Sequence, residues 1–230
     1  MTLQILFADD AIAAVDKPPG RIVVPGRGSP EQTVREEAEV QLGPLWVVHR
    51  LDRGTSGVLL FARSADTHRA LCGAFEHHRV AKRYLALVRG VLSGDRRVDA
   101  AVVAGRKGKM RIGEGIAGAR AATTFLRLFA AFPPGASLIE AFPASGRTHQ
   151  VRVHLAHAGH PLLVDPDYGD APPWRSPGGD AILERTPLHA ASLELLHPSS
   201  GAPLRIEAPV PSDMQGAIAA LQASQESKSG

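Results

Sequence analysis

Residues 46–64 read WVVHRLDRGTSGVLLFARS. Two apolar runs rich in Val, Leu and Phe, residues 45–48 and 58–62, flank a polar connection over residues 49–57. Short apolar runs of this composition predict two buried strands. The connection holds two arginines, one aspartate and two glycines. Because a charged turn between rigid strands commonly presents reactive side chains, we take Asp52 as a candidate nucleophile.

An aspartate in a turn can also do no more than cap neighbouring amides, and local composition favours that ordinary role. A catalytic carboxylate must stay ionised, and a partly buried one needs a cation nearby. Arg147 could be that cation, since an arginine fork matches a carboxylate, or it could be a solvated residue in the first turn of a helix. Tyr84, one of two tyrosines, could stack on a flat substrate or pack in the core.

Composition limits the classes of protein that fit. The chain has 230 residues, 44% hydrophobic and 21% charged, which suits one large domain or two packed lobes. A net charge of +3 with clustered arginines is compatible with a nucleic-acid partner. Cys72 is the single cysteine, so no intramolecular disulfide can form. We find no signal peptide and no apolar run near the about 20 residues that span a bilayer.

The predicted elements follow from apolar periodicity and from Gly and Pro punctuation. Strands are predicted at residues 3–8, 12–16, 21–24, 45–48, 58–62, 82–88, 98–103, 123–132, 137–142, 188–196 and 204–207. Helices are predicted at residues 30–42 after a Ser29 cap, 65–77 after Ser64, 147–157 and 211–221, with a disordered tail at 223–230. Residues 105–118 and 161–179 are predicted as loops. Adjacent strand runs favour an α+β fold with a mixed, mainly antiparallel sheet and flanking helices.

Two further groups of polar residues invite functional hypotheses. A metal site could use His149, His154, His157, His160 and Asp165, but their spacing matches no known ligand pattern and the arginines among them would repel a cation. Imidazoles near a phosphate-binding surface are the alternative. The loop at residues 105–118 carries basic residues that could follow a nucleic-acid backbone or simply be solvated. They are Arg106, Lys107, Lys109 and Arg111.

Ordered motifs give the chain a specific resemblance. HRLDRGTSGVLLFARS resembles the central motif of the RluA-type RNA pseudouridine synthases. KRYLALVRG, SGRTHQVRVHLAHAGHPLLVDPDYG and RTPLHAASLELLHP are similar to motifs that follow it in that family, and VDKPPG is similar to the family's first strand and turn. Ser145 and Val151 stand where the family commonly has Thr and Ile. The resemblance covers residues 3–211, and a chance match of four ordered motifs is implausible.

The resemblance implies roles for single residues. Asp52 would be the nucleophile and Arg147 its partner, while Tyr84 would stack on the target uracil and help to remove its C5 proton. Arg50 would fill the gap that a flipped uridine leaves in the RNA. The remaining RNA contacts are expected at His49, Arg53, Lys82, Lys107, Lys109, Arg111 and His149.

The resemblance also implies a fold and an activity. We expect one catalytic domain over residues 1–222, with a bent sheet and two lobes around a central catalytic cleft. We expect isomerisation of uridine in structured rRNA or tRNA, without cofactor, metal or membrane, by a cytoplasmic monomer. Since the first motif falls within the first twenty residues, we expect no S4 RNA-binding domain ahead of it. A catalytically silent RNA-binding or assembly protein of the same fold is the alternative.

Overall fold

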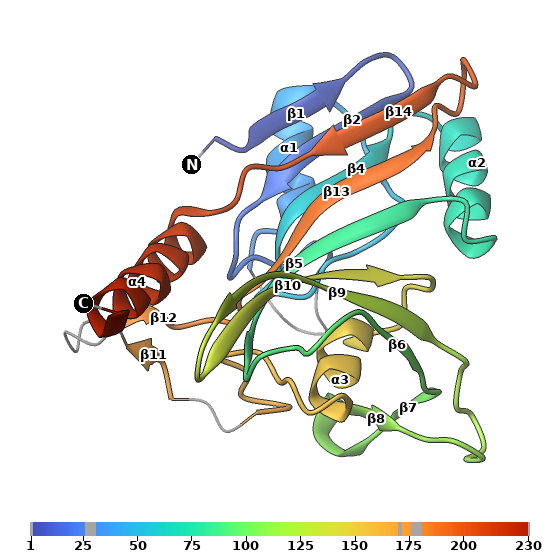
Figure 1. Ribbon diagram of the computed structural model, residues 1–230. Coiled ribbons are helices and arrows are strands. Elements are labelled where there is room, and N and C mark those ends of the chain that lie inside the picture. Colours follow the sequence, from blue (N-terminus) through green and yellow to red (C-terminus); the bar gives the residue numbers. More distant parts are fainter. Residues whose placement is uncertain (1, 26–30, 170–171, 176–180, 230) are drawn as a thin grey trace. The chain divides into compact units, whose positions relative to one another are not determined.

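The computed structural model describes residues 2–25, 31–169, 172–175 and 181–229 (Figure 1). The chain forms two compact units. Unit 1 comprises Met1–Lys82 and Ala190–Pro209, and unit 2 comprises Arg83–His189 and Val210–Gly230. No helix in the described part of the chain is long and apolar enough to cross a membrane.

Unit 1 is a sheet covered by a helix on each face. Its strands follow the order β1-β2-β4-β13-β14, and β3 also pairs with β4. The bounds are β1 Gln4–Ala8, β2 Ile12–Lys17, β3 Trp46–Val47, β4 Ser56–Ala62, β13 Leu188–Leu196, β14 Pro203–Glu207, α1 Val34–Leu42 and α2 Ala65–Glu76. Strands β1 and β4 both pair antiparallel with β2, and β13 pairs antiparallel with β14.

Strand β4 lies at the centre of unit 1, and every one of its residues is buried. Val58 and Leu60 pack in one cluster with Leu71 of α2, whereas Leu59 and Phe61 pack in another with residues of α1. A strand covered on both faces needs an unbroken apolar run instead of an alternating one. The run predicted at residues 58–62 therefore forms the buried strand from which the preceding turn projects.

Helix α1 begins later than predicted. Its N-cap is Thr33, which forms a capping box with Glu36: each side chain accepts a hydrogen bond from the other residue's backbone N–H. The predicted cap, Ser29, lies outside the described residues. Gly43 ends the helix as predicted. Residues 21–24, predicted as a strand, form none, because the Ile22 carbonyl accepts a hydrogen bond from Val34 N–H at the start of α1.

Unit 2 contains an antiparallel sheet of order β5-β10-β9-β6. Strands β7 and β8 form a separate antiparallel pair, as do β11 and β12. The bounds are β5 Ala81–Arg89, β6 Arg96–Asp99, β7 Val102–Ala104, η1 (a 3₁₀ turn) Arg106–Gly108, β8 Met110–Ile112, β9 Thr123–Phe132, β10 Ala136–Pro143, α3 Gln150–His157, β11 Trp174–Arg175, β12 Ala181–Leu183 and α4 Ser212–Ser229.

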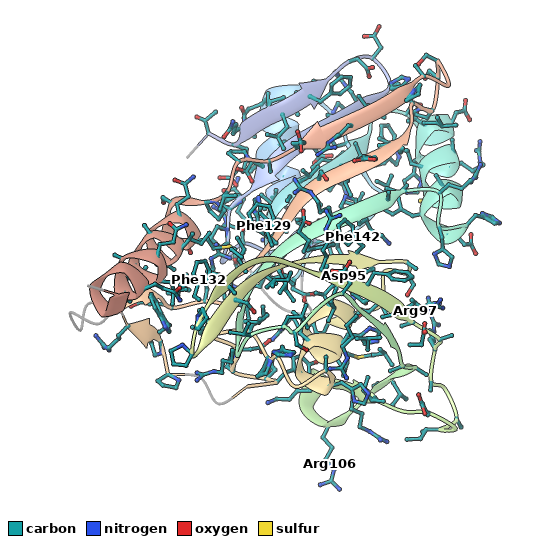
Figure 2. The ribbon with its side chains drawn as sticks, viewed as in Figure 1. Asp95, Arg97, Arg106, Phe129, Phe132 and Phe142 are labelled. Atoms are coloured by element: carbon teal, nitrogen blue, oxygen red, sulfur yellow. The ribbon has the colours of Figure 1, made fainter. Side chains whose placement is uncertain are left out.

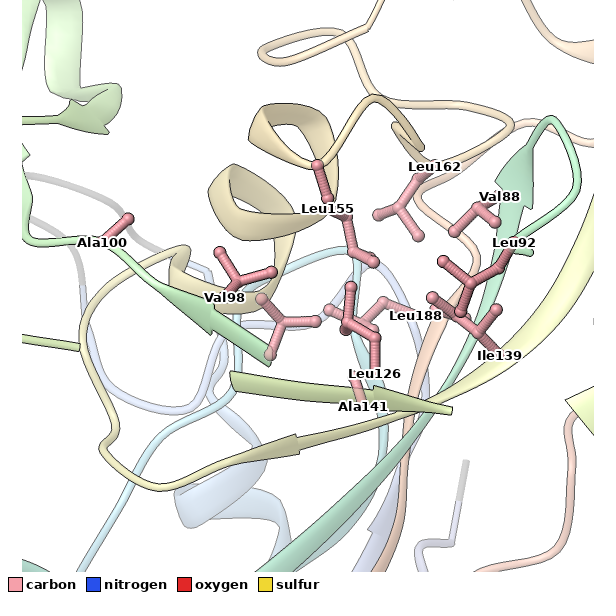
Figure 3. Packing of buried hydrophobic residues seen from close by; sticks show 13 residues of the cluster. Val88, Leu92, Val98, Ala100, Leu126, Ile139, Ala141, Leu155, Leu162 and Leu188 are labelled. Carbon is pink, nitrogen blue, oxygen red and sulfur yellow. The ribbon is translucent and has the colours of Figure 1, made fainter. Parts of the chain in front are cut away.

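Helix α3 packs on one face of this sheet (Figure 3). Val151 and Leu155 join a buried cluster with Leu126 of β9 and Ile139 of β10. The hairpin of β9 and β10 confirms the prediction for residues 123–142. The α+β class with a mainly antiparallel sheet is likewise confirmed, whereas the bend and the central cleft stay predictions.

Three predicted elements of unit 2 have different bounds in the structure. The strand predicted at residues 98–103 is divided between β6 and β7, because the chain changes its pairing partner from β9 to β8. The loop predicted at residues 105–118 contains η1 and β8. Helix α4 continues to Ser229, through the predicted disordered tail, since residues 217–229 contain neither Gly nor Pro to break it.

Gly57 offers a test of this packing. Its φ is +111°, and a Cβ there would lie 2.2 Å from the carbonyl oxygen of Ala190 on β13. We expect Gly57→Ala to lower the free energy of unfolding by about 3 kcal/mol or more, because backbone strain and a backbone clash add together. Gly201→Ala is the matched control, since its φ is +71° but nothing lies within 4 Å. It should cost about 1–2 kcal/mol. Equal denaturation midpoints for the two variants would contradict the close approach of β4 to β13.

Candidate active site

A buried lysine holds the turn that carries Asp52. Lys17 is 0% exposed, and its Nζ donates hydrogen bonds to the carbonyls of Thr55 at 2.7 Å, Pro18 at 3.0 Å and Arg53 at 3.2 Å. Thr55 N–H also donates to the carbonyl of Asp52 at 3.1 Å. A buried ammonium is tolerated only when its donors are satisfied, so the ion ties the turn to the end of β2. Asp52 itself is half-buried.

Of the residues near Asp52, His49 is held by contacts within the protein and Arg50 is exposed. The Nε2 atom of His49 accepts a hydrogen bond from Leu60 N–H at 2.9 Å, and its ring stacks on Phe75 at 4.8 Å between centroids. Burial, aided by the charge of Lys82, lowers the pKa of His49 to about 3. A neutral ring bound to β4 has a structural role, so we leave His49 out of the proposed RNA contacts.

Neither Arg53 nor Lys82 is placed as an exposed, unpaired side chain that could bind a phosphate group. Arg53 forms an ion pair with Glu31 at 2.7 Å and donates to the carbonyl of Gly20. Lys82 is 8% exposed, although it lies beside the exposed Ala81 at the start of β5. Arg53 therefore contributes to the local structure around the turn, whereas Lys82 is buried at the start of β5.

Tyr84 lies in unit 2 on β5, where it faces Ala141 of β10. It is half-buried and packs against the hydrophobic cluster to which Val151 and Leu155 of α3 belong. Alternation along the strand places Tyr84, Ala86 and Val88 on one face of the sheet. The ring is thus fixed on the face that α3 covers, while part of it remains accessible.

Arg147 lies in a turn before α3 and not in the first turn of the helix as predicted. Its backbone N–H donates to Oε1 of Gln150 at 3.0 Å, and Ser145 Oγ donates to the same oxygen at 2.7 Å. Gln150 Nε2 in turn donates to the carbonyl of Thr123 at 3.0 Å and bonds Thr124 Oγ1 at 3.1 Å. One glutamine therefore anchors the turn to β9.

The side chain of Arg147 has an unmet donor. Its Nε is buried and has no hydrogen-bond partner within the described residues. A buried donor without a partner is costly, and such groups in folded proteins call for a physical explanation. A carboxylate or a phosphate from outside unit 2 would satisfy the Nε–H of Arg147.

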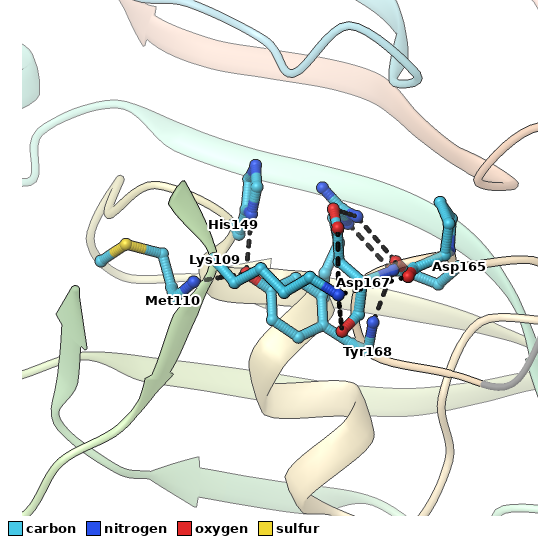
Figure 4. A network of polar contacts seen from close by, with 8 residues as sticks. Lys109, Met110, His149, Asp165, Asp167 and Tyr168 are labelled. Atoms are coloured by element: carbon cyan, nitrogen blue, oxygen red, sulfur yellow. Dashed lines mark hydrogen bonds and ion pairs between the residues drawn. The ribbon is translucent and has the colours of Figure 1, made fainter. Parts of the chain in front are cut away.

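A polar network next to this turn was missed by the sequence analysis (Figure 4). Arg152 on α3 binds the buried Asp165 through two hydrogen bonds, at 2.6 and 2.9 Å, and also Asp167 at 2.8 Å. Burial opposes ionisation of Asp167, but its bond to Arg152 holds its pKa below the usual value. The acidic turn DPDYG at residues 165–169 was the available signal, but only as a metal-ligand candidate.

Residues that suggested a metal site, His154 and Asp165 among them, are committed to other contacts. His154 is fully buried, with Nδ1 bonded to Thr124 Oγ1 at 2.9 Å and Nε2 to the carbonyl of Ala100 at 3.0 Å. Asp165 is occupied by Arg152. Across residues 2–25, 31–169, 172–175 and 181–229, no three His, Cys, Asp or Glu side chains gather as a metal site. The structure gives the metal hypothesis no ligand set.

The basic segment of residues 105–118 presents only some of its charges. Lys109 forms an ion pair with Asp167 at 3.5 Å. Arg106 and Arg111 are exposed, and Figure 2 shows the Arg106 side chain extending away from the ribbon. The side chain of Lys107 lies outside the described residues. The arginines are thus the charges best exposed for a phosphate backbone.

The lysine clamp can be tested by hydrogen exchange. Lys17→Met removes the donor and leaves three carbonyls without it, so we expect a loss of about 2 kcal/mol or more in stability. The amides of Thr55 and Gly20, which bond to the carbonyls of Asp52 and Arg53, should exchange faster than in the wild type. The amide of Leu193 in the β13–β14 pair is the internal control. Unchanged exchange at Thr55 and Gly20 would show that Lys17 does not hold the turn.

Comparison with known proteins places the chain in a family. The family model described as RNA pseudouridylate synthase matches residues 11–157. Ribosomal large subunit pseudouridine synthase D of Xanthomonas campestris is 37% identical, over 96% of this chain and 70% of its own length. tRNA pseudouridine synthase C of Salmonella typhimurium is 38% identical, over 90% of this chain and 85% of its own length. The solved structure of human RNA pseudouridylate synthase domain containing 4 is 26% identical with a TM-score of 0.77, covering 95% of this chain and 93% of that one. The chain belongs to the RNA pseudouridylate synthase family.

Proposed function

We propose that this chain isomerises uridine to pseudouridine in structured rRNA or tRNA, with Asp52 as the catalytic carboxylate. One observation carries the proposal: the matched residues 11–157 contain Asp52, Tyr84 and Arg147 together. The relatives named above for ribosomal RNA and for tRNA support the substrate class. The clamped turn of Asp52 and the unmet Nε of Arg147 are what this reaction requires of the two residues.

The target base must leave its stack to reach Asp52, because the reacting atoms of a stacked uridine are not accessible. Unstacking costs a few kcal/mol, and stacking of the flipped uracil on Tyr84 offsets part of this cost. Arg50 is exposed and would enter the space that the uridine leaves. A planar guanidinium suits this role because it can stack between bases.

Asp52 then assists cleavage of the N1–C1′ glycosidic bond. It either adds to C1′ or takes the C2′ proton to give a glycal. The detached uracil turns, a C5–C1′ bond forms, and loss of the C5 proton yields pseudouridine. All heavy atoms of the nucleoside are retained, and a proton taken up at N1 balances the proton lost from C5. Tyr84 lies against the turned base and helps to remove the C5 proton, and the guanidinium of Arg147 pairs with the carboxylate and keeps it ionised.

The RNA backbone would be held by the exposed cations of both units. Arg50 in unit 1 and Arg111 in unit 2 are the main proposed contacts, since each is exposed. Lys109, Lys107 and His149 are further candidates, although Lys109 must share its charge with Asp167. Arg53 and Lys82 are kept as weaker candidates because of their structural contacts. Each phosphate contact makes binding salt-dependent through counterion release.

We further infer a monomer that acts in the cytoplasm. The substrate class supports this location, because rRNA and tRNA of the bacterial relatives' kind are cytoplasmic molecules. A single cysteine fits a reducing compartment. A monomer is supported by the presence of all three proposed catalytic residues in one chain.

Tritium release tests the reaction directly. Purified protein is incubated with large-subunit rRNA or unmodified tRNA transcripts that carry tritium at C5 of uridine. We expect the wild type to release tritium and Asp52→Asn to release none, since an amide cannot act as a nucleophile or base. RNA affinity should change less than about threefold, because Asp52 contributes little to binding before the chemical step.

Asp66→Asn is the matched control, because Asp66 is an exposed residue of α2 in the same unit. It should retain the wild-type rate. An Asp52→Asn protein that turns over normally would refute the assignment of the carboxylate. A wild type that binds these RNAs but releases no tritium from any of them would favour the silent RNA-binding alternative.

A further inference from the structure

The hydroxyl of Tyr168 joins three segments of unit 2 (Figure 4). Its Oη accepts a hydrogen bond from the backbone N–H of Met110 on β8 at 2.7 Å. The same oxygen lies 2.7 Å from Nδ1 of His149, the residue immediately before α3. Tyr168 itself belongs to the 165–169 turn. One oxygen therefore connects strand β8 in the basic segment of residues 105–118, the acidic turn and the beginning of α3.

The ring that carries this hydroxyl is fixed by its own contacts. Tyr168 N–H donates to Oδ1 of Asp165 at 3.3 Å. The guanidinium of Arg152 lies over the ring with Cζ 4.9 Å from its centroid, and the His149 ring meets it edge-on at 5.6 Å. Arg152 is held in place by Asp165. The hydroxyl is thus presented by a ring that Asp165 and Arg152 also hold in place.

The Met110 amide donates to Oη. The hydroxyl keeps a proton and a second lone pair for its bond with Nδ1 of His149, whose direction follows the tautomer of the imidazole. Burial raises the pKa of Tyr168, so the hydroxyl keeps its proton at neutral pH. Both bonds at Oη are satisfied in this arrangement.

His149 occupies a backbone conformation that needs support. Its φ is +53°, in the left-handed region that non-glycine residues adopt at a cost. His149 stands between Arg147 and the first residue of α3, inside the turn that the Gln150 N–H closes on the Arg147 carbonyl, so its conformation is part of the backbone that carries Arg147. Gln150 holds one side of this turn through Ser145 and Arg147. On the other side of the turn, His149 is bonded to the Tyr168 hydroxyl.

We propose that Tyr168 is a positioning residue for Arg147, acting through His149 and tying the basic β7–β8 pair to the turn that carries the arginine. The inference rests on the proposed function, in which Arg147 pairs with the catalytic carboxylate. The new element is the Tyr168 hydroxyl, which links the basic segment of residues 105–118 to the turn that carries Arg147. RNA bound to the basic segment would therefore contact the same hydrogen-bonded group that positions the arginine. Removing the hydroxyl leaves the ring under Arg152 but deletes the bond between His149 and Tyr168.

Tyr168→Phe tests the proposal, with Ser137→Ala as the control. Ser137 is a buried residue of β10 whose Oγ donates to the Gly90 carbonyl at 3.0 Å, so the control also deletes one hydroxyl from unit 2. In single-turnover tritium release on the transcript that the wild type modifies, Tyr168→Phe should lower the saturating rate about tenfold. The protein concentration at half-saturation should stay within about twofold of the wild-type value. Ser137→Ala should change neither quantity.

Coupling to Arg147 is measured by a double-mutant cycle and by NMR. If Tyr168 acts through the arginine, Tyr168→Phe should add little to the loss caused by Arg147→Lys, whereas independent effects would multiply. The buried Nε–H of Arg147, assigned by its absence in Arg147→Lys, should give a sharp, slowly exchanging signal in the wild type and in Ser137→Ala. In Tyr168→Phe this signal should broaden or exchange rapidly.

An unchanged Nε–H signal, an unchanged saturating rate or a multiplicative cycle would overturn the proposal. So would a loss confined to RNA affinity, which would mean that Tyr168 serves only the basic segment. A wild type without tritium release would overturn the proposed function instead, and the NMR comparison would still decide whether Tyr168 positions Arg147.

Discussion

The fold of unit 1 depends on a charge in its interior. Lys17 is enclosed, and its ammonium is tolerable only because backbone carbonyls of the neighbouring turns converge on it. Two of those carbonyls, from Arg53 and Thr55, belong to the turn that carries Asp52. The hydrogen bonds that satisfy the lysine therefore also hold the carboxylate in place. His49 adds a second attachment by accepting a hydrogen bond from β4. A half-buried carboxylate on a rigid turn is what aspartate-based chemistry on a nucleoside needs.

In unit 2, too, buried polar side chains hold the turns that carry the candidate site residues. Gln150 anchors the Arg147 turn to β9, and the buried Arg152–Asp165 pair fixes the adjacent acidic turn. These groups bond to other protein atoms, whereas the buried Nε of Arg147 has no hydrogen-bond partner in the described structure. A buried guanidinium donor without a protein partner, held beside hydrogen-bonded turns, is typical of a site prepared for an anion. Tyr84 is half-buried on the face of the sheet that α3 covers.

Much of the architecture was predictable because the strand signals are local. The hairpin of residues 123–142 is marked by apolar runs around Pro133, and β13 matches its predicted bounds. Helix starts were less predictable: Ser29 and Thr33 both look like caps, and only the reach of Glu36 distinguishes them. The left-handed His149 has no signature in the sequence. Nor does the Tyr168 junction, whose partners lie 58 and 19 residues away along the chain.

The central claim is that Asp52, held by its clamped turn, converts uridine to pseudouridine. The most direct measurement is pseudouridine mapping of total RNA from cells that lack this chain, complemented with the wild type or with Asp52→Asn. We expect at least one rRNA or tRNA position to lose pseudouridine without the chain, to regain it with the wild type and to stay uridine with Asp52→Asn. Restoration of that position by Asp52→Asn, or an RNA map that does not change when the chain is removed, would contradict the assignment of Asp52.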